Sequence, residues 1–276
     1  MICFPNAKIN IGLNVLEKRE DGYHNIESIF YPVALCDALE LVETAGFSNL
    51  NLTLFGNPVP GDLNTNLCVK AYNLLSAKYK LPSLNLWLLK CIPIGGGLGG
   101  GSADAAFFLK SLNELFSLNL SIEELKLYAS QIGSDCTFFI DNMSSLVSGK
   151  GDVITPIPLD LSNHYISIIY PQIHVDTRNA YSLITPRKRA ESLNQIILNS
   201  TINSWKEIIV NDFEEPIFNL HPELSQMKKR LYNEGAIYAS MTGSGSALYG
   251  IFDKKPVLND AFSSCKIWTI PPKSST

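Results

Sequence analysis

A glycine-rich stretch offers the clearest chemistry in the sequence. Residues 93–104 read PIGGGLGGGSAD, and six of these twelve residues are glycine, out of 18 glycines in a chain of 276 residues. Glycine loses more conformational entropy on ordering than any other residue and adds no side chain to a core. It does provide bare backbone N–H groups, which can surround an anion where no Cβ atom intervenes. We therefore expect a phosphate-binding loop here.

Three kinds of phosphate loop can be compared with this stretch. A P-loop needs a lysine directly after its last glycine, and none follows here. The dinucleotide fingerprint G-x-G-x-x-G fits Gly95, Gly97 and Gly100, but so glycine-rich a run matches by accident, and no regular βαβ unit follows. The third kind joins a strand to a helix whose N-terminus carries partial positive charge. We favour it over the fingerprint and over a flexible surface loop, because a strong strand and a strong helix flank the glycines.

The elements beside the loop follow from periodicity. Residues 84–92 (LNLWLLKCI) predict a strand, and the apolar stripe over residues 105–116 predicts a helix with Ser102 as its N-cap. Near the N-terminus, apolar and polar residues alternate in KINIGLNVL. This alternation predicts a strand that carries Lys8 and Asn10 on the face opposite to the apolar one.

The remaining pattern mixes strands and helices. Without regular β–α alternation, it indicates an α+β fold. A polar, proline-rich turn near residues 156–163 predicts a boundary between a first domain, 1–157, and a second domain, 158–276. Further strands are predicted over residues 26–35, 37–44, 50–55 and 165–170, with a hairpin within 145–157 and a strand–turn–strand unit over 236–252. One helix is predicted to begin from a cap at Asn64 or Thr65, and a second to run from a capping box of Ser121 and Glu124 to Gly133. Further helices are predicted from near Thr177 to about residue 232.

Composition narrows the class of protein. Hydrophobic residues make up 46% and charged residues 17% of the chain, with a net charge of −4, which is typical of a globular protein of two domains. The chain has no basic stripe for nucleic acid and no apolar run for a membrane. The N-terminus lacks a signal-peptide pattern, and the six cysteines are scattered, so we expect reduced thiols in the cytoplasm. The four histidines show no metal-ligand spacing, and the oligomeric state is left open.

Several motifs in order resemble those of one enzyme family. PIGGGLGGGSADAA resembles the phosphate-binding loop of the GHMP small-molecule kinases. The segments PNAKINIGLNV, REDGYHNIESIF, IGSDCTFF and MTGSGSALYGIF resemble further motifs of that family, so the resemblance extends from residue 5 to about residue 252. REDGYH is similar to a motif of the branch whose substrate carries cytidine. The resemblance implies a two-domain GHMP-kinase-like fold with the active site in the cleft between the domains.

The resemblance also implies an activity. The reaction is transfer of a phosphoryl group from ATP, with Mg²⁺, to the 2-hydroxyl of a cytidine-diphosphate-linked sugar alcohol. Asp135 is then the base that takes the hydroxyl proton, and Lys8 lies beside it and the phosphoryl group. On the residues alone, Asp135 better suits an N-cap of the next helix, and Lys8 a solvated strand lysine. Thr137 stands where the family usually has proline, and SADAA replaces a commoner SSNAA but keeps Ser102.

Binding roles come from the resemblance as well. The cytosine lies between the aromatic rings of Tyr23 and Tyr181, and His24 reads its edge. Both tyrosines also suit ordinary half-buried positions. The residues assigned to ATP are Pro93, Gly95, Gly96, Gly97, Leu98, Gly99, Gly100, Gly101, Ser102 and Ala103, and those assigned to the substrate are Asn10, Tyr23, His24, Thr177, Tyr181, Gly243 and Ser244.

Other functions remain possible at this point. Related kinases share the glycine loop and phosphorylate homoserine, mevalonate or galactose. A non-catalytic nucleotide-binding protein is a second alternative, against which the retention of Lys8 and Asp135 argues. An oxidoreductase that uses the G-x-G-x-x-G match is a third. The protein ligands of Mg²⁺ cannot be assigned from the sequence.

Overall fold

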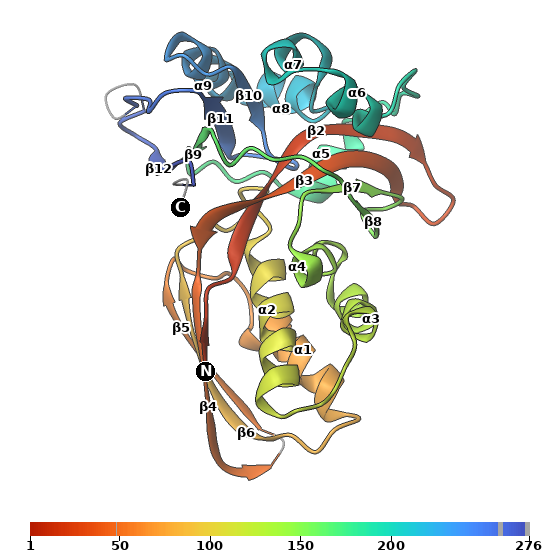
Figure 1. Cartoon of the computed structure of the whole chain (residues 1–276), viewed down its shortest axis with the longest axis vertical. Helices are drawn as coiled ribbons and strands as arrows, with labels where there is room; N and C mark the ends of the chain where they lie inside the picture. Colours follow the sequence, from red (N-terminus) through yellow and green to blue (C-terminus); the bar gives the residue numbers. More distant parts are fainter. Residues whose placement is uncertain (48, 259–261, 274–276) are drawn as a thin grey trace. The chain divides into compact units, whose positions relative to one another are not determined.

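The computed structural model describes residues 1–47, 49–258 and 262–273 (Figure 1). The chain falls into two compact units, neither of which is continuous in sequence. Unit 1 consists of Met1–Ala7, Ala34–Ile94 and Gly99–Asn142, and unit 2 consists of Lys8–Val33, Gly95–Leu98 and Met143–Thr276. Because the units alternate along the chain, they do not decide the expected domain boundary between residues 157 and 158, which stays a prediction.

Unit 1 contains a four-stranded sheet with helices on one face. Its strand order is β1 (Ile2–Cys3), β4 (Ala38–Phe47), β6 (Pro82–Lys90) and β5 (Leu50–Gly56). β5 pairs with β6 in parallel, and the other pairs are antiparallel. Every second residue of β6, at Leu84, Leu86 and Leu88, is completely buried, as expected for a strand with one face on a core. Figure 1 shows α1 (Leu67–Ser76) and α2 (Gly100–Leu115) along the same side of this sheet.

Local signals explain where the helices of unit 1 begin. The predicted capping box of Ser121 and Glu124 is confirmed at the start of α3 (Ile122–Ile132), which ends at the C-cap Gly133. The predicted cap of α1 at Asn64 or Thr65 is wrong, because a 3-10 turn, η1 (Leu63–Thr65), precedes that helix. The side chain of Asn66 caps α1 instead and accepts a hydrogen bond from Cys68 N at 2.9 Å. The unit ends with the 3-10 turn η2 (Ser134–Cys136) and α4 (Phe138–Asp141).

Unit 2 contains two four-stranded sheets. The predicted strand at Lys8, the hairpin within 145–157 and the strand–turn–strand over 236–252 are all confirmed. One sheet has the order β2 (Asn6–Lys18), β3 (His24–Cys36), β7 (Ser145–Ser148) and β8 (Val153–Pro156), and the other has the order β10 (Tyr238–Met241), β11 (Leu248–Phe252), β9 (Tyr165–Tyr170) and β12 (Lys266–Ile270).

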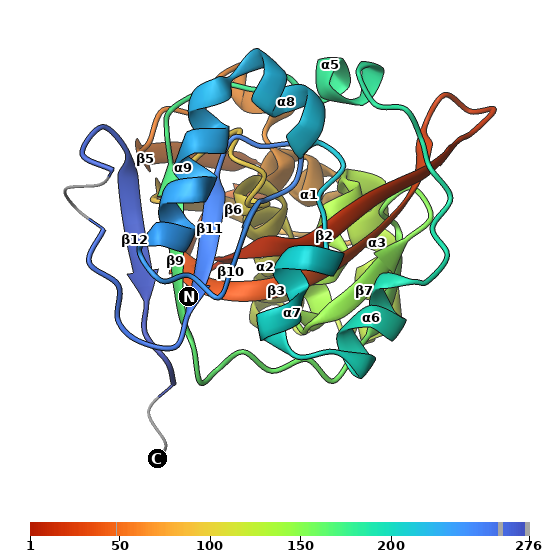
Figure 2. The ribbon, with the colours of Figure 1, turned by 90° about the horizontal axis from the view of Figure 1, so that it is seen from above.

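Short helices complete unit 2. Figure 2 shows α8 (Glu214–Leu220) and α9 (Pro222–Asn233) over one face of the sheet that contains β10 and β11. Leu224 and Leu231 of α9 pack into a core with Leu248 and Phe252 of β11. The remaining helices are α5 (Thr177–Ser182), α6 (Leu193–Asn199) and α7 (Ile202–Ile208). In the described ranges, no helix is both long and apolar enough to cross a bilayer.

Candidate active site

The first half of the glycine loop packs against a turn that follows β10. Residues 95–98 belong to unit 2. The hydroxyl of Thr242 lies 3.1 Å from Gly97 O, and Ala247 N donates to Gly96 O at 3.3 Å. A Cβ atom on Gly97, where φ is +75°, would lie 2.0 Å from Thr242 O. One on Gly243, where φ is +58°, would lie 3.0 Å from the Cα of Gly97. These two glycines allow two backbones to touch, a requirement independent of any phosphate.

The second half of the loop opens α2. Gly99 is the N-cap in the left-handed conformation, with φ at +73°, and makes no side-chain cap. The prediction of Ser102 as N-cap is therefore wrong, because the N-cap lies three residues earlier and Ser102 is within the first turn of the helix. The first helical hydrogen bond runs from Ala103 N to Gly99 O at 2.9 Å, so the N–H groups of residues 100–102 have no acceptor within the helix. Apart from its chain neighbours and the backbone of its own helix, no heavy atom lies within 4 Å of a Cβ built on Gly101. An anion can therefore approach this turn.

A small pocket adjoins this turn within unit 1. Its volume is about 160 Å³, and Gly101 is part of its lining. The sequence analysis missed this pocket, although a proline- and glycine-rich connection after a strand, GNPVPGD, is a signal for a functional loop. The lining includes the apolar side chains of Leu54, Val59 and Leu63 and the polar side chains of Asp62 and Asn66.

A larger pocket in unit 2 has different chemistry. It measures about 640 Å³, and two lysines line it. Lys228 pairs with Glu214 at 2.6 Å and Lys206 with Glu207 at 3.6 Å. Because both ammonium groups already face carboxylates, this pocket offers a phosphate less than the first turn of α2 does.

Asp135 lies in η2, half-buried, and does not cap a helix. The N-cap of η2 is Gly133, and that of α4 is Thr137. The alternative structural role considered for Asp135 is thus absent. The next residue, Cys136, is completely buried. Burial raises the pKa of the Cys136 thiol to about 12, so the thiol stays protonated.

Thr137 takes the backbone conformation that proline would impose. Its φ is −61°, within the range that the proline ring enforces. The replacement of proline by threonine therefore needs no change in this turn. The cost lies elsewhere, since Thr137 Oγ1 is buried and finds no hydrogen-bond partner among the described residues.

Lys8 is buried rather than solvated. Lys8 is 3% exposed and Asn10 is 1% exposed. Lys8 Nζ donates to Asn10 Oδ1 at 2.5 Å and lies 4.3 Å from the centre of the Phe30 ring. Asn10 Nδ2 in turn donates to Ser28 Oγ at 2.9 Å. A buried ammonium group is costly, and such groups concentrate at functional sites. Lys8 belongs to unit 2 and Asp135 to unit 1, so their meeting at one reacting centre stays a prediction.

The residues expected to hold the substrate lie at two places in unit 2. The ring of His24 stacks on Tyr181 with centres 5.2 Å apart and planes 18° apart. Tyr181 also meets the edge of Phe213 at 4.8 Å. Partial burial and nearby Lys18 lower the pKa of His24, which favours the neutral imidazole. Tyr23 is 61% exposed, and Lys150 Nζ lies 5.5 Å from its ring.

The second place is a hydroxyl pair. Thr177 Oγ1, at the start of α5, lies 3.0 Å from Ser244 Oγ, which follows Gly243 in the turn after β10. The structure thus brings together two residues that are 67 positions apart in sequence. Both belong to the set that the sequence analysis expected to bind substrate.

A buried charge cluster beneath the loop was missed by the sequence analysis. The Lys90 ammonium, at the end of β6, pairs with Asp37 and with Asp104 of α2. Asp37 Oδ1 also accepts hydrogen bonds from Cys91 N and Ile92 N. Asp104 is 3% exposed, and its Oδ1 has no partner among the described residues. Burial, partly offset by Lys90, raises the pKa of Asp104 to about 7. A charged residue within the apolar ADAAFF run was the available signal.

Comparisons with known proteins cover nearly the whole chain. The GHMP kinases N terminal domain matches residues 66–149, and the GHMP kinases C terminal domain matches residues 186–266. The 4-diphosphocytidyl-2-C-methyl-D-erythritol kinase of Bacteroides thetaiotaomicron is 48% identical over 94% of each chain. The enzyme of that name from Azobacteroides pseudotrichonymphae is 51% identical over 93% of this chain and 94% of its own.

Solved structures agree with these relatives. A crystal structure of 4-(cytidine 5'-diphospho)-2C-methyl-D-erythritol kinase matches with a TM-score of 0.83 and 28% identity over 98% of each chain. A crystal structure of mevalonate kinase matches with a TM-score of 0.72 and 14% identity over 98% of each chain, which indicates a shared fold alone.

The two halves of the glycine loop should respond differently to alanine. Gly97→Ala forces a left-handed alanine and a clash with Thr242 O, at a cost of at least about 1–2 kcal/mol. Gly101→Ala places its methyl group in open space within a helix, where alanine is favoured. We expect the melting temperature to fall for Gly97→Ala and to stay level or rise for Gly101→Ala. Equal melting temperatures would contradict the assignment of Gly97 to packing.

The stability of the chain should report the titration of Asp104. Its ordinary pKa is 3.8, and the raised value means that the folded state holds the proton more tightly than the unfolded state. This contribution to stability is complete below the ordinary pKa and is lost as pH rises through about 7. Asp104→Asn cannot lose a proton there. We therefore expect the melting temperature of Asp104→Asn, relative to wild type, to rise between about pH 4 and 7 and to level off at higher pH.

The exposed Glu43 of β4 supplies the control for this series. Glu43→Gln should keep a constant difference from wild type over the same pH range, because its side chain faces solvent. A pH-independent difference for Asp104→Asn would show that Asp104 is already ionised in the folded protein below neutral pH.

Proposed function

The chain belongs to the 4-diphosphocytidyl-2-C-methyl-D-erythritol kinases of the GHMP family, and from this premise we propose how its residues act. It is an ATP-dependent kinase that phosphorylates the 2-hydroxyl of 4-diphosphocytidyl-2-C-methyl-D-erythritol, a reaction of isoprenoid synthesis. The observation that carries the residue assignment is the nearly complete burial of the Lys8 ammonium, which Asn10 Oδ1 accepts at 2.5 Å. Asp135, in the turn η2, does not serve as a helix cap.

ATP binding is assigned to the glycine loop and its neighbouring pocket. The phosphates lie on the free N–H groups of the first turn of α2, where the helix carries partial positive charge. The nucleoside occupies the pocket of about 160 Å³ beside Gly101. Apolar side chains such as Leu54 and Val59 suit the faces of a base, and Asp62 and Asn66 suit its polar edges.

Mg²⁺ enters as the complex with ATP. Among the described residues, no group of three or more His, Cys, Asp or Glu side chains is arranged to hold a metal ion. A magnesium ion that keeps its water and binds substrate phosphates needs no such group. The hydroxyl of Ser102, in the first turn of α2, suits a magnesium-bound water. When bound, the ion would supply positive charge that offsets the charge on the transferring phosphoryl group.

Phosphoryl transfer needs alignment and charge compensation more than covalent chemistry from the protein. We assign to Asp135 the acceptance of the proton from the substrate hydroxyl, and to Lys8 the stabilisation of negative charge on the phosphoryl oxygens. Asn10 holds the Lys8 ammonium at 2.5 Å and so limits its rotamers. Burial of Lys8 at this cost argues against a non-catalytic nucleotide-binding protein.

Recognition of the cytidine end is assigned to the aromatic residues and the hydroxyl pair of unit 2. The exposed ring of Tyr23 is free to stack on a base, while Tyr181 is already stacked on His24. A neutral His24 can donate at one ring nitrogen and accept at the other. Thr177, Gly243 and Ser244 provide hydroxyl and backbone groups for the diphosphate or the ribose.

The six free cysteines suit the predicted cytoplasmic location.

The direct test is ATP consumption with a panel of alcohols. The panel contains 4-diphosphocytidyl-2-C-methyl-D-erythritol, homoserine and mevalonate, and we expect turnover of the first alone. CDP should compete with that substrate more strongly than UDP. Turnover of homoserine or mevalonate, without turnover of 4-diphosphocytidyl-2-C-methyl-D-erythritol, would overturn the proposed substrate. Absence of turnover with all three, despite ATP binding, would favour a non-catalytic protein.

Loss of the proposed base should separate turnover from binding. Asp135→Asn keeps the shape but cannot take a proton, so kcat should fall by roughly 10²–10⁴-fold. ATP affinity, measured by calorimetry, should change little. The matched control is Asp141→Asn in the same segment, whose carboxylate pairs with Lys126 at 2.8 Å. Near-wild-type kcat in Asp135→Asn, or an equal loss in the control, would show that the base lies elsewhere.

A further inference from the structure

An asparagine outside every motif of the sequence analysis lies at the centre of the polar contacts of unit 2. Asn211, just before α8, is 2% exposed. Its Nδ2 donates to two backbone oxygens, Met241 O at 2.8 Å and Gly243 O at 2.9 Å. Its Oδ1 accepts from Phe213 N at 3.0 Å. Both donor hydrogens and the acceptor are thus used, which no other side chain of this size can reproduce.

These contacts clamp the turn after β10 on both sides of Thr242. The Thr242 hydroxyl accepts from Asn10 N at 3.1 Å and lies 3.1 Å from Asn10 Oδ1. Asn10 Oδ1 is also the acceptor for Lys8 Nζ. Through Met241 and Gly243, Asn211 therefore holds the residue that orients Asn10, and Asn10 orients Lys8. Gly243 itself leads into Ser244, the partner of Thr177.

The same residue also sets the ring beneath the aromatic pair. Phe213 N is held by Asn211, and the Phe213 ring supports Tyr181, on which His24 stacks. The backbone around Asn211 is anchored to β2, since Leu13 N donates to Val210 O at 3.0 Å and Asp212 N to Leu13 O at 2.8 Å. Because β2 holds the backbone beside Asn211, the Asn211 side chain can fix the positions of the groups that it contacts.

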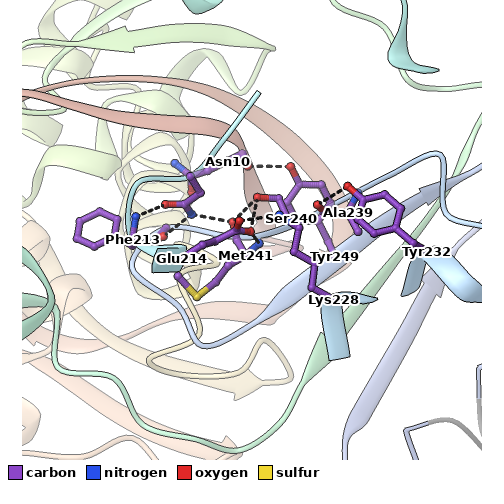
Figure 3. Close-up of polar contacts among 11 residues, drawn as sticks. Asn10, Phe213, Glu214, Lys228, Tyr232, Ala239, Ser240, Met241 and Tyr249 are labelled. Atoms are coloured by element: carbon purple, nitrogen blue, oxygen red, sulfur yellow. Dashed lines mark hydrogen bonds and ion pairs between the residues drawn. The ribbon is translucent and has the colours of Figure 1, made fainter. Parts of the chain in front are cut away.

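A second buried residue of the same segment has a different role. Glu214 accepts from Met241 N at 2.8 Å and from Ser240 Oγ at 3.1 Å, and it pairs with Lys228. Figure 3 shows Glu214, Ser240 and Met241 together at the end of β10, with Asn10 and Tyr249 nearby. Glu214 thus secures the strand, whereas Asn211 alone reaches past the strand to the carbonyl of Gly243.

We propose that Asn211 is a positioning residue for the kinase reaction, which holds the turn Met241–Gly243 and, through Phe213, the His24–Tyr181 pair in the geometry that receives the cytidine-linked substrate. The inference rests on the proposed function of these residues. It distinguishes Asn211 from a residue that supports the fold alone. One of its three contacts is to Gly243, an assigned substrate residue, and the other two lead through Phe213 to Tyr181 and through Met241 and Thr242 to Asn10. None of the three is to α2, to which we assign the phosphates.

The decisive variant is Asn211→Asp. It keeps the shape but turns an acceptor toward two carbonyls, so both hydrogen bonds are lost. Loss of a hydrogen bond of ordinary net strength corresponds to about a tenfold change in an equilibrium constant. We expect the KM for 4-diphosphocytidyl-2-C-methyl-D-erythritol and the Kd for CDP to rise by about tenfold or more, with kcat also lowered through Lys8. The KM for ATP should stay within about twofold. A purely structural role would reduce the active fraction and leave each KM unchanged.

Asn113 provides the matched control. Its Nδ2 donates to Leu120 O at 3.0 Å and its Oδ1 accepts from Leu120 N at 2.9 Å, within unit 1. Asn113→Asp therefore loses a comparable backbone contact, and it should lower the melting temperature without changing the KM for the cytidine substrate. Asn211→Ala, which removes the donors without adding repulsion, should reproduce the KM change if Asn211→Asp does not fold.

The outcomes separate this inference from the proposed function. Equal KM and CDP affinity in wild type and the folded Asn211 variants would overturn the positioning role. So would failure of both variants to fold, because Asn211 would then serve unit 2 as a whole. A wild-type chain that binds CDP but phosphorylates nothing would overturn the proposed function, and the CDP affinities would still decide the role of Asn211.

Discussion

Buried polar side chains on β2 are the constraint on which the arrangement of unit 2 depends. Lys8 and Asn10 are almost inaccessible to water, and such groups are tolerated inside a protein only when partners satisfy them. Those partners come from distant parts of the chain. Ser28 lies 18 residues from Asn10, and Thr242 lies 232 residues from it. The hydroxyl of Tyr249 also donates to Asn10 O at 2.8 Å. The buried polar side chains of β2 thus bind the turn after β10, which carries Gly243 and Ser244.

The glycine loop shows how one sequence motif can serve two physical purposes. Gly97 and Gly243 are small because two backbones approach each other there. Gly101 is small where no protein atom outside its own helix turn is near, and there the absence of a side chain leaves room for a ligand. The buried triad of Lys90, Asp37 and Asp104 lies under this second half and holds the end of β6 to α2. The turn at Gly101 is therefore open on the ligand side, while the buried ion pairs of Lys90 hold its other side in place.

Much of the fold follows from local sequence patterns. The alternation around Lys8 and the capping box of α3 were sufficient, because each signal acts within a few residues. Local reasoning failed at the start of α2, where Ser102 looks like a cap but the left-handed Gly99 begins the helix earlier. The same reasoning misplaced the cap of α1, because Asp62 starts a 3-10 turn before Asn66.

The candidate site was predicted less completely, and the reason is tertiary. The family motifs identified Lys8, Asp135 and the substrate residues, but burial of Lys8 is a property of the packed structure. The stacking of His24 on Tyr181 and the role of Asn211 depend on contacts between segments more than 150 residues apart or outside any motif. The buried carboxylate of Asp104 sits within the glycine motif itself, yet only its contact with Lys90 identifies it.

The approach of Gly97 to the turn after β10 also sets an order of events during synthesis. The hydrogen bond from Thr242 spans 145 residues, and long-range contacts of this kind form late in folding because loop closure must precede them. A ribosome that has made residues 1–200 has completed every glycine of the loop but none of the turn that supports residues 95–98. The nascent chain therefore emerges with a complete phosphate motif that cannot yet take its final shape. The final packing of residues 95–98 is thereby reserved for chains translated past the turn after β10.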